Sequence, residues 1–412
     1  MKIRSITYFC NPGWPLDDTI LQCAGEFVAA ARPAFEDAGY EVQTVRLATP
    51  PFPHLLPDCK TSRVAVFAHG LESAASTLGL DYVSIGPALP QFPESYAAIP
   101  EVLAATENVF ASGAMSSPKI GVSLPAVRAC AEIISQLASV DENGFANLYF
   151  AALANVPPGA PFFPAAYHGG SLPSFALATE AADLAVTAFT EAADLTEARQ
   201  NLSTALETHA KKLVAVADSL TRRFADSLNI SFGGIDYSLA PFPEAGLSLG
   251  TALERLGVPA VGLHGSLAAA AILADTVDKA DFPRAGFSGL MLPVLEDATL
   301  AVRAAEGILS IKDLLLYSAV CGTGLDTVPL PGDTTPQQLT AILLDLAALA
   351  QRLDKPLTAR LMPIPGKGAG DPTGFDFAFF ANSRVMGVGA EGLRGHLAGD
   401  ENFDLQPRRG RA

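Results

Sequence analysis

The sequence has few charged residues for its length. Charged side chains make up 17% of the 412 residues, whereas hydrophobic side chains make up 49%. An average soluble protein is about one-quarter charged, so this composition predicts a large buried core with internal strands or a sizeable oligomer interface. Positive charge is the scarcer sign, because the formal net charge is −16. An acidic chain without a basic stripe argues against binding to nucleic acid or to anionic membrane surfaces.

Long apolar runs are also missing, and we expect no signal peptide. The stretch VPAVGLHGSLAAAAILADTV is rich in alanine and glycine and is interrupted by His264, so it does not resemble the roughly 20 apolar residues of a transmembrane helix. The first residues, MKIRSITYFCNPGWP, are strand-like and contain no hydrophobic signal-peptide region. We therefore expect a cytoplasmic protein that does not associate with membranes.

The five cysteines do not form a recognisable framework. Their number is odd, no Cys-x-x-Cys pair occurs and the gaps between them are wide, which excludes a disulfide scaffold and a zinc finger. Each is interpreted as a small buried hydrophobic residue. The HExxH, P-loop, EF-hand and nucleophile-elbow motifs are absent as well.

The apolar periodicity alternates between strands and helices along most of the chain. The expected strands cover residues 3–9, 40–48, 64–70, 80–88, 108–114, 146–156, 287–295, 356–364 and 374–380. The expected helices include residues 19–39, 123–140, 174–193, 197–228 and 335–354. This repeated strand–turn–helix unit predicts an α/β fold in which helices cover a parallel or mixed sheet. Such folds bind ligands beyond the carboxyl ends of their strands.

Polar clusters that follow apolar runs supply the candidate site residues. In PFFPAAYHGG, His168 stands before two glycines that let a ligand approach. It is the candidate general acid or base, with Tyr167 as a substrate-binding neighbour; the alternative is a histidine satisfied by nearby backbone. In FGGIDYSLAPFPEAG, Asp236 and Ser238 would share one face of an extended segment. Asp236 could bind a metal or a substrate hydroxyl, or simply form a turn or a cap.

Two further clusters are rich in acids. Glu296 and Asp297 close the stretch FSGLMLPVLED, where they would bind a hard cation, act as a general base or cap a helix. In VCGTGLDTVPLPGDTTPQQ, residues 335–338 form a capping box that begins a helix. Capping does not account for Asp326 and Asp333. Cys321 would be reactive only beside a positive group or a helix N-terminus.

The stretch RLMPIPGKGAGDP combines flexible backbone with two cations. Arg360 and Lys367 flank its glycines, which predicts an anion site for a carboxylate or a phosphate. A glycine-rich surface loop is the alternative.

These stretches together resemble an uncharacterised prokaryotic family called domain of unknown function 711, over most of the chain. The resemblance is carried by MKIRSITYF, PFFPAAYHGG, FALATEAADLAV, DYSLAP, SGLMLPVLED, CGTGLDTVPLPGDTT and RLMPIPGKGAGD. It implies a large α/β barrel similar to that of pyruvate formate-lyase, built from two sets of parallel strands. Radical enzymes with this barrel carry a cysteine on an internal loop and a radical glycine near the C-terminus. SRVMGVG lacks the rest of that glycine motif, so we expect no radical chemistry.

We expect one α/β barrel domain over residues 1–400 and a disordered tail over residues 401–412. The main hypothesis is a non-radical hydrolase or lyase that acts by acid/base chemistry on a small anionic or polyhydroxylated metabolite. The expected roles are catalytic for His168, Asp236, Cys321 and Asp326, substrate-binding for Tyr167, Ser238, Arg360 and Lys367, and metal-binding for Glu296 and Asp333.

The cofactor stays undetermined, although Mg²⁺ or Ca²⁺ would suit these oxygen donors. One alternative is a metabolite-binding or regulatory protein without catalysis, and another is a structural subunit. The low charge favours a homo-oligomer, most simply a dimer.

Overall fold

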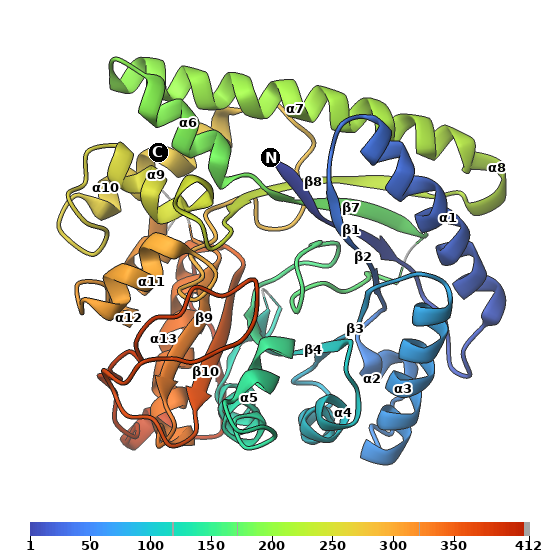
Figure 1. Cartoon of the computed structure of the whole chain (residues 1–412). Helices are drawn as coiled ribbons and strands as arrows, with labels where there is room; N and C mark the ends of the chain where they lie inside the picture. Colours follow the sequence, from blue (N-terminus) through green and yellow to red (C-terminus); the bar gives the residue numbers. More distant parts are fainter. Residues whose placement is uncertain (118, 171, 321, 408–412) are drawn as a thin grey trace.

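The computed structural model describes residues 1–117, 119–170, 172–320 and 322–407 (Figure 1). Its strands are β1 (Lys2–Phe9), β2 (Val42–Ala48), β3 (Tyr82–Ala88), β4 (Val109–Ser117), β5 (Gly121–Ser123), β6 (Phe150–Ala154), β7 (Ser174–Glu180), β8 (Ser231–Ala240), β9 (Gly324–Pro331), β10 (Leu357–Ile364) and β11 (Asn402–Phe403). Its α-helices are α1 (Asp18–Asp37), α2 (Phe52–Leu55), α3 (Thr61–Thr77), α4 (Ile99–Ala105), α5 (Leu124–Leu137), α6 (Ala182–Glu191), α7 (Leu195–Arg223), α8 (Ala225–Leu228), α9 (Leu249–Arg255), α10 (Ser266–Lys279), α11 (Ala298–Ala305), α12 (Ile311–Val320) and α13 (Pro336–Leu353). Short 3-10 helices are η1 (Pro93–Ala98), η2 (Phe145–Tyr149), η3 (Ala245–Leu247) and η4 (Gly395–Ala398).

Within the described residues, the strands form one mixed sheet of eleven. Its main path runs β8-β7-β1-β2-β3-β4-β6-β10-β9, and β5 and β11 continue from β4 at its side. Strands are parallel within β8–β7, within β1–β2–β3–β4–β6 and within β10–β9. They are antiparallel where β7 meets β1 and where β6 meets β10. Helices surround the sheet (Figure 1), so the chain has the α/β fold that its periodicity predicts.

An irregular segment with isolated bridges links the two outer strands of this path. We call residues 284–296 the linking segment. The N–H of Met291 donates to the carbonyl of Ser238 in β8 at 2.9 Å, and the N–H of Val294 donates to the carbonyl of Asp326 in β9 at 3.0 Å. This linkage is compatible with the barrel that the family resemblance implies.

Side chains of the strands alternate between a hydrophobic core and an internal cavity. In β10, Leu357 and Leu361 belong to the core, whereas Thr358 and Arg360 line the cavity. This is the period of two that β-strand geometry imposes. The inner side of the sheet is therefore available to polar residues, while the outer side packs against the helices.

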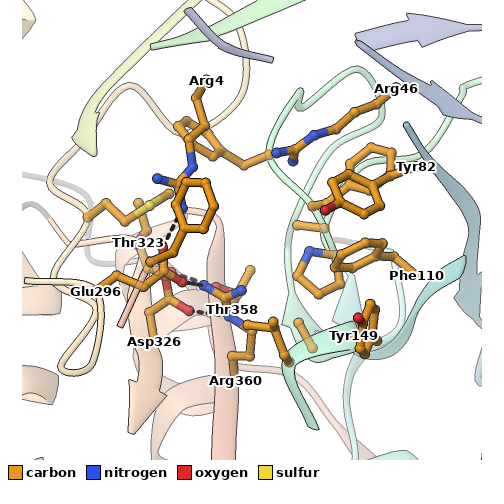
Figure 2. A pocket seen from close by; sticks show the side chains of 18 of the residues that line it. Arg4, Arg46, Tyr82, Phe110, Tyr149, Glu296, Thr323, Asp326, Thr358 and Arg360 are labelled. Carbon is orange, nitrogen blue, oxygen red and sulfur yellow. Dashed lines mark hydrogen bonds and ion pairs between the residues drawn. The ribbon is translucent and has the colours of Figure 1, made fainter. Parts of the chain in front are cut away.

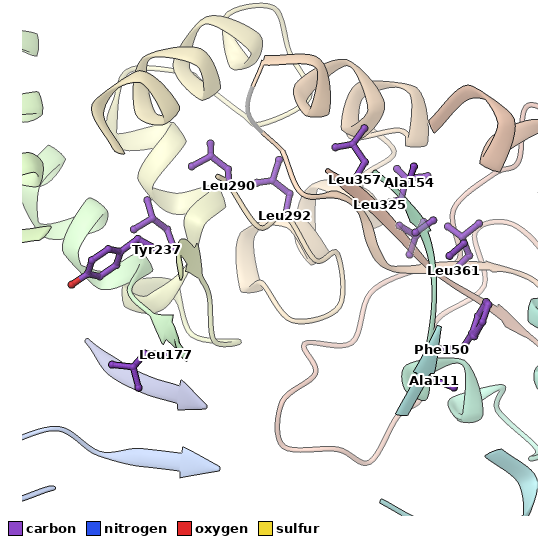
Figure 3. Close-up of a cluster of buried hydrophobic side chains, with 14 of the residues drawn as sticks. Ala111, Phe150, Ala154, Leu177, Tyr237, Leu290, Leu292, Leu325, Leu357 and Leu361 are labelled. Atoms are coloured by element: carbon purple, nitrogen blue, oxygen red, sulfur yellow. The ribbon is translucent and has the colours of Figure 1, made fainter. Parts of the chain in front are cut away.

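The linking segment contributes to the same core as the strands on either side of it. Figure 3 shows its Leu290 and Leu292 with Tyr237 of β8 on one side and Leu325 of β9 on the other, and all four belong to one cluster of buried residues. Burial of each such side chain is worth about 1.5–3 kcal/mol. The segment is therefore anchored by packing as well as by hydrogen bonds.

Three expected strands are other structures. Residues 287–295 form only isolated bridges, at Leu290 and Pro293, before a turn. Residues 64–70 lie inside α3, whose buried residues recur at helical spacing of three and four: Val64, Phe67, Ala68, Leu71 and Ala75. The short apolar run is the buried face of a longer helix. Residues 374–380 form a loop, because their alternating phenylalanines pack on one another and over the cavity instead of pairing in the sheet.

One expected helix is divided. Residues 174–193 form strand β7 and then helix α6, which begins only at Ala182. The first part is extended because β1 and β8 pair with it on both sides, and this pairing overrides a local preference for helix.

The C-terminal part of the chain returns to the sheet. Asn402–Phe403 pairs with β5, so residues at the start of the expected tail are part of the fold.

The capping box at Thr335 is confirmed, because its side chain and that of Gln338 each accept a backbone N–H. Across the described ranges, no helix is both long and apolar enough to cross a membrane.

Candidate functional site

A cavity of about 130 Å³ lies on the inner side of the sheet. Seven strands contribute to its lining, namely β1, β2, β3, β4, β6, β9 and β10. The linking segment and the loops at residues 162–165 and 377–379 complete it. Because residues from the whole length of the chain converge here, the cavity is the natural candidate for a functional site.

One wall of the cavity is a network of ion pairs, which we call the charged wall. Nη2 of Arg360 donates to Oε1 of Glu296 at 2.7 Å, and its Nε donates to Oδ1 of Asp326 at 2.6 Å. Nη2 of Arg4 donates to Oε2 of Glu296 at 2.5 Å, and its Nη1 reaches Oε2 of Glu180 at 3.4 Å. Glu296 therefore lies between two guanidinium groups, whereas Asp326 is held by one.

This difference in partners separates the two carboxyl groups chemically. Burial opposes ionisation of Glu296, but the charges of Arg360 and Arg4 lower its pKa overall. Burial raises the pKa of Asp326, the contact with Arg360 only partly opposes it, and the charge of Glu296 adds to the increase. Oδ2 of Asp326 has no hydrogen-bond partner among the described residues. The two guanidinium groups therefore favour the ionised form of Glu296, while burial favours the protonated form of Asp326 more than in a free aspartate.

The opposite wall is aromatic. Ring centres of Tyr82 and Phe110 lie 5.4 Å apart, those of Phe110 and Tyr149 lie 4.9 Å apart, and those of Phe110 and Phe163 lie 5.3 Å apart. We call these four residues the aromatic wall. Figure 2 shows Tyr82, Phe110 and Tyr149 facing the charged wall across the cavity.

Arg46 of β2 reaches into the cavity beside the aromatic wall (Figure 2). It is 9% exposed, and its guanidinium lies 5.6 Å from the ring centre of Tyr82 and 5.1 Å from that of Phe163. Its Nε donates to Oγ1 of Thr44 at 2.8 Å. No carboxylate among the described residues forms an ion pair with it. Burial lowers the pKa of Arg46 to about 9, and the positive charge of Arg4 contributes.

The cavity brings together three of the residues predicted from the sequence. Glu296, Asp326 and Arg360 all line it and are bonded to one another. They come from three of the polar clusters, and they meet because the linking segment, β9 and β10 lie side by side.

Asp236 and Ser238 are neighbours, but they lie outside the cavity lining. Oγ of Ser238 donates to Oδ1 of Asp236 at 2.6 Å, as expected for residues on one face of an extended segment. The N–H groups of Phe287 and Ser288 donate to the same carboxylate at 2.7 and 2.8 Å. A Cβ on Gly286 would lie 2.1 Å from Oδ2 of Asp236. Asp236 therefore fixes the start of the linking segment, whose Phe287 lines the cavity.

The remaining predicted residues are elsewhere. His168 is buried outside the cavity lining and donates its backbone N–H to the carbonyl of Thr49 at 2.9 Å. The Tyr167 hydroxyl donates to the carbonyl of Val156 at 2.8 Å. Cys321 lies outside the described residues. Their expected roles stay predictions without support from the cavity.

Two charged residues of the last clusters lie in loops away from the cavity. Asp333 is exposed, and Nζ of Lys367 donates to the carbonyl of Pro372 at 2.7 Å. Asp297 is the N-cap of α11 and accepts the N–H groups of Thr299 and Leu300. The expected helix-capping alternative thus accounts for Asp297.

The carboxylates do not fit a site for Mg²⁺ or Ca²⁺. No group of three or more His, Cys, Asp or Glu side chains in the described part of the chain could hold a metal ion. Glu296 and Asp326 are occupied by guanidinium groups, whose positive charge opposes a cation at the same oxygens.

Arg4, Arg46 and the aromatic wall are cavity residues that the glycine-rich motifs do not predict. The sequence does contain a signal for the two arginines, because each is the charged residue within an apolar stretch, IRSITYF or VQTVRLA. A lone charge in a strand buried on both faces needs a partner or a cavity. The aromatic residues carry no such signal, since phenylalanine and tyrosine are common in buried strands.

Comparison with known proteins gives relatives over most of the chain. The family described as Uncharacterised ACR (DUF711) matches residues 1–379. A UPF0210 protein of Pyrobaculum arsenaticum is 35% identical over 373 residues, which cover 86% of this chain and 81% of the relative. A UPF0210 protein of Methanopyrus kandleri is 34% identical over 370 residues, with the same two shares. One of Pelotomaculum thermopropionicum is 32% identical over 370 residues, again with shares of 86% and 81%.

Proposed function

Because the chain belongs to the family Uncharacterised ACR (DUF711), whose description names no reaction, we propose a function from the chemistry of the cavity. The protein is a non-radical lyase or hydrolase that transfers a proton on a small anionic metabolite bound between the charged and aromatic walls. Asp326 carries the proton, and Arg360 and Arg46 stabilise negative charge on the substrate.

One observation carries this proposal: Glu296 and Asp326 share Arg360 and line the cavity, but Glu296 is bonded to a second guanidinium, whereas Oδ2 of Asp326 has no hydrogen-bond partner among the described residues. Two neighbouring carboxyl groups with diverging pKa values are a recurring arrangement in acid/base catalysis. Glu296 remains an anion that holds Arg4 and Arg360 in place. Burial raises the pKa of Asp326, which suits this carboxyl group to act as a proton acceptor and then as a proton donor.

The proton transfer balances within the cavity. The carboxylate of Asp326 takes one proton at Oδ2, which has no hydrogen-bond partner among the described residues, and becomes neutral. The substrate gains one negative charge, which lies between guanidinium groups in a site lined by buried side chains, where electrostatic stabilisation is strong. The proton then returns to the product or to the leaving group, so Asp326 is again ionised for the next cycle.

The experiment is a search for turnover by proton NMR. Pools of small carboxylates and phosphate esters are incubated in D₂O with the full chain, and each spectrum is followed for new products or for exchange of C–H protons. A substrate found in this way is then given to Asp326→Asn and to Asp333→Asn. Asp333 is the matched control, because it is an exposed aspartate outside the cavity.

We expect Asp326→Asn to lose about 10²–10⁴-fold in rate, the usual contribution of a positioned acid or base. Asp333→Asn should keep the wild-type rate. A variant Asp326→Asn that is as active as wild type would show that another group carries the proton. Binding without turnover by any pool member would instead support a metabolite-binding protein without catalysis.

A further inference from the structure

The cavity also specifies the charge and the shape of what it binds. This inference rests on the proposed function in one respect, since it concerns the ligand of the same cavity. We propose that Arg46 binds the anionic group of the ligand, and that the ligand is a planar monoanion in which a carboxylate is joined to an aromatic or conjugated group that stacks on the aromatic wall.

Arg46 is the cavity arginine that lacks an anion. Arg46 and Arg360 are almost equally buried, at 9% and 8% exposed. Arg360 is bonded to two carboxylates, whereas no ion pair is formed by Arg46 within the described residues. A buried charge without a counter-ion is strongly unfavourable. Aromatic rings over the guanidinium return only part of that cost, so an incoming anion completes the site.

The charges that line the cavity indicate a ligand with one negative charge. Arg4, Arg46 and Arg360 line the cavity with Glu296 and Asp326. The three nearby carboxylates, with Glu180 included, all pair with Arg4 or Arg360, so Arg46 is the arginine of the lining without an anion. Glu180 stands behind Arg4, where it is bonded to Arg4 and Gln43 and lies outside the cavity lining. The Glu180 carboxylate is therefore bonded to other residues and forms no ion pair with Arg46.

The donors left on Arg46 suit a carboxylate. Its Nε is used by Oγ1 of Thr44, and both Nη groups lack an acceptor among the described residues. A guanidinium binds the two oxygens of a carboxylate with parallel hydrogen bonds. Thr44 in turn donates to the carbonyl of Arg4 at 2.8 Å, so Arg46 is held in one orientation before a ligand arrives.

The opposing aromatic surfaces indicate a flat ligand. The aromatic wall faces the centre of the cavity (Figure 2), and Phe287, Phe377 and Phe379 line it as well. Aromatic rings favour stacking or edge contacts with another ring. The cavity volume of about 130 Å³ is several times the roughly 10–15 Å³ that a single water needs, so the cavity has room for a small organic molecule.

The test measures binding of benzoate and trans-cinnamate to the full chain by calorimetry and by saturation-transfer NMR. Benzamide keeps the shape without the charge, acetate keeps the charge without the ring, and inorganic phosphate replaces the carboxylate. We expect at least one of the two aromatic carboxylates to bind at least tenfold more tightly than benzamide, acetate and phosphate. If neither aromatic carboxylate binds, or if acetate or benzamide binds as tightly, the proposed ligand class is wrong.

Variants assign the binding to Arg46. Arg46→Met should weaken binding of the aromatic carboxylate at least tenfold, and Arg46→Lys should weaken it less, because the charge remains but the planar fork is lost. Arg63→Met is the control, since Arg63 pairs with Asp58 at the exposed surface. Unchanged binding in both Arg46 variants would overturn the assignment, and Arg46→Lys decides the question if Arg46→Met does not fold.

The same probes separate this inference from the proposed function. Asp326→Asn removes a negative charge from the cavity, so it should bind the aromatic carboxylate at least as tightly as wild type even though turnover is lost. Binding that depends on Arg46 without any turnover would leave the ligand class intact and remove the catalytic proposal. Turnover of a substrate without a ring, at a rate that Arg46→Met does not change, would leave the catalytic proposal intact and remove the proposed ligand class.

Discussion

Asp236 in β8 and Asp326 in β9 are two buried aspartates at opposite ends of the linking segment. Burial raises the pKa of both. The carboxylate of Asp236 is bonded to a hydroxyl and to backbone N–H groups, whereas that of Asp326 is bonded to the guanidinium of Arg360 and faces the cavity. The two sites differ in their partners and in access to a ligand.

This difference teaches that a raised pKa alone does not identify a catalytic acid. The neutral donors around Asp236 hold its carboxylate in place but supply no full positive charge, so burial raises its pKa to about 6. The surroundings of Asp236 are also too crowded for a substrate at this point, since a Cβ on Gly286 would collide with Oδ2 of Asp236. Structural carboxyl groups can have perturbed pKa values, and the cavity is the observation that singles out Asp326.

The largest expected effect comes from removing the cation of the Asp326 site. Arg360→Met should lower the free energy of unfolding by about 3–5 kcal/mol, because Asp326 is then a buried carboxylate without its partner. Urea denaturation at pH 7 measures the effect. Arg46→Met is the matched control, since it removes an equally buried arginine that leaves no carboxylate behind, and we expect it to cost less than about 1 kcal/mol. Equal losses in the two variants would show that Arg46 also has a structural partner.

The second effect concerns the pH dependence of the Asp236 site. The folded-state pKa of about 6 lies above the ordinary aspartate value of 3.8, so the folded protein holds this proton more strongly than the unfolded chain. The stabilising contribution is complete below about pH 3.8 and is lost as the pH rises through about 6. A shift of this size corresponds to about 3 kcal/mol between the two limits.

Asp236→Asn cannot titrate, so its stability relative to wild type should rise by about 2.4 kcal/mol between pH 4 and pH 7. Urea denaturation at several pH values measures this difference. Asp17→Asn is the control, because Asp17 is an exposed N-cap of α1 and asparagine caps a helix equally well. A difference between Asp236→Asn and wild type that does not change with pH would mean that Asp236 does not titrate in this range.

The sequence was sufficient for the fold class and for part of the candidate site. Strand and helix periodicity predicted the α/β fold, and the polar residues after or within apolar runs included Glu296, Asp326 and Arg360. Residues 64–70 show the limit of this reasoning. Seven apolar-rich residues fit a strand, and only the longer repeat of α3 reveals the helix.

The rest of the site depends on contacts that periodicity cannot supply. Asp236 and Asp326 have the same type, burial and strand setting, and only their spatial partners distinguish them. Arg46 lies in a strand without any glycine-rich motif, so the sequence does not mark it as a site residue. Its candidate role follows from the absence of a carboxylate partner in the folded structure. Only the folded structure shows that Arg46 has no counter-ion, because the charged residues around it come from β1, β9 and the linking segment.

The smallest effect tests how neutral donors tune Asp236. Ser238→Ala removes the hydroxyl that donates to Oδ1 of Asp236 at 2.6 Å and that lowers the pKa of this carboxyl group against burial. We expect a loss of about 1 kcal/mol at pH 7, where the carboxylate is charged, and a smaller loss at pH 4, where it is protonated. Urea denaturation at both pH values measures the change.

Ser288→Ala provides the matched comparison for this effect. The Ser288 hydroxyl donates to the carbonyls of Ile235 and Ala285 at 3.3 and 3.1 Å, while its backbone N–H keeps the bond to Asp236. Because carbonyl groups do not titrate, Ser288→Ala should lose the same free energy at both pH values. If Ser238→Ala behaved in the same way, the hydroxyl would bond both protonation states of Asp236 equally, and the neutral donors would serve only to position the carboxyl group.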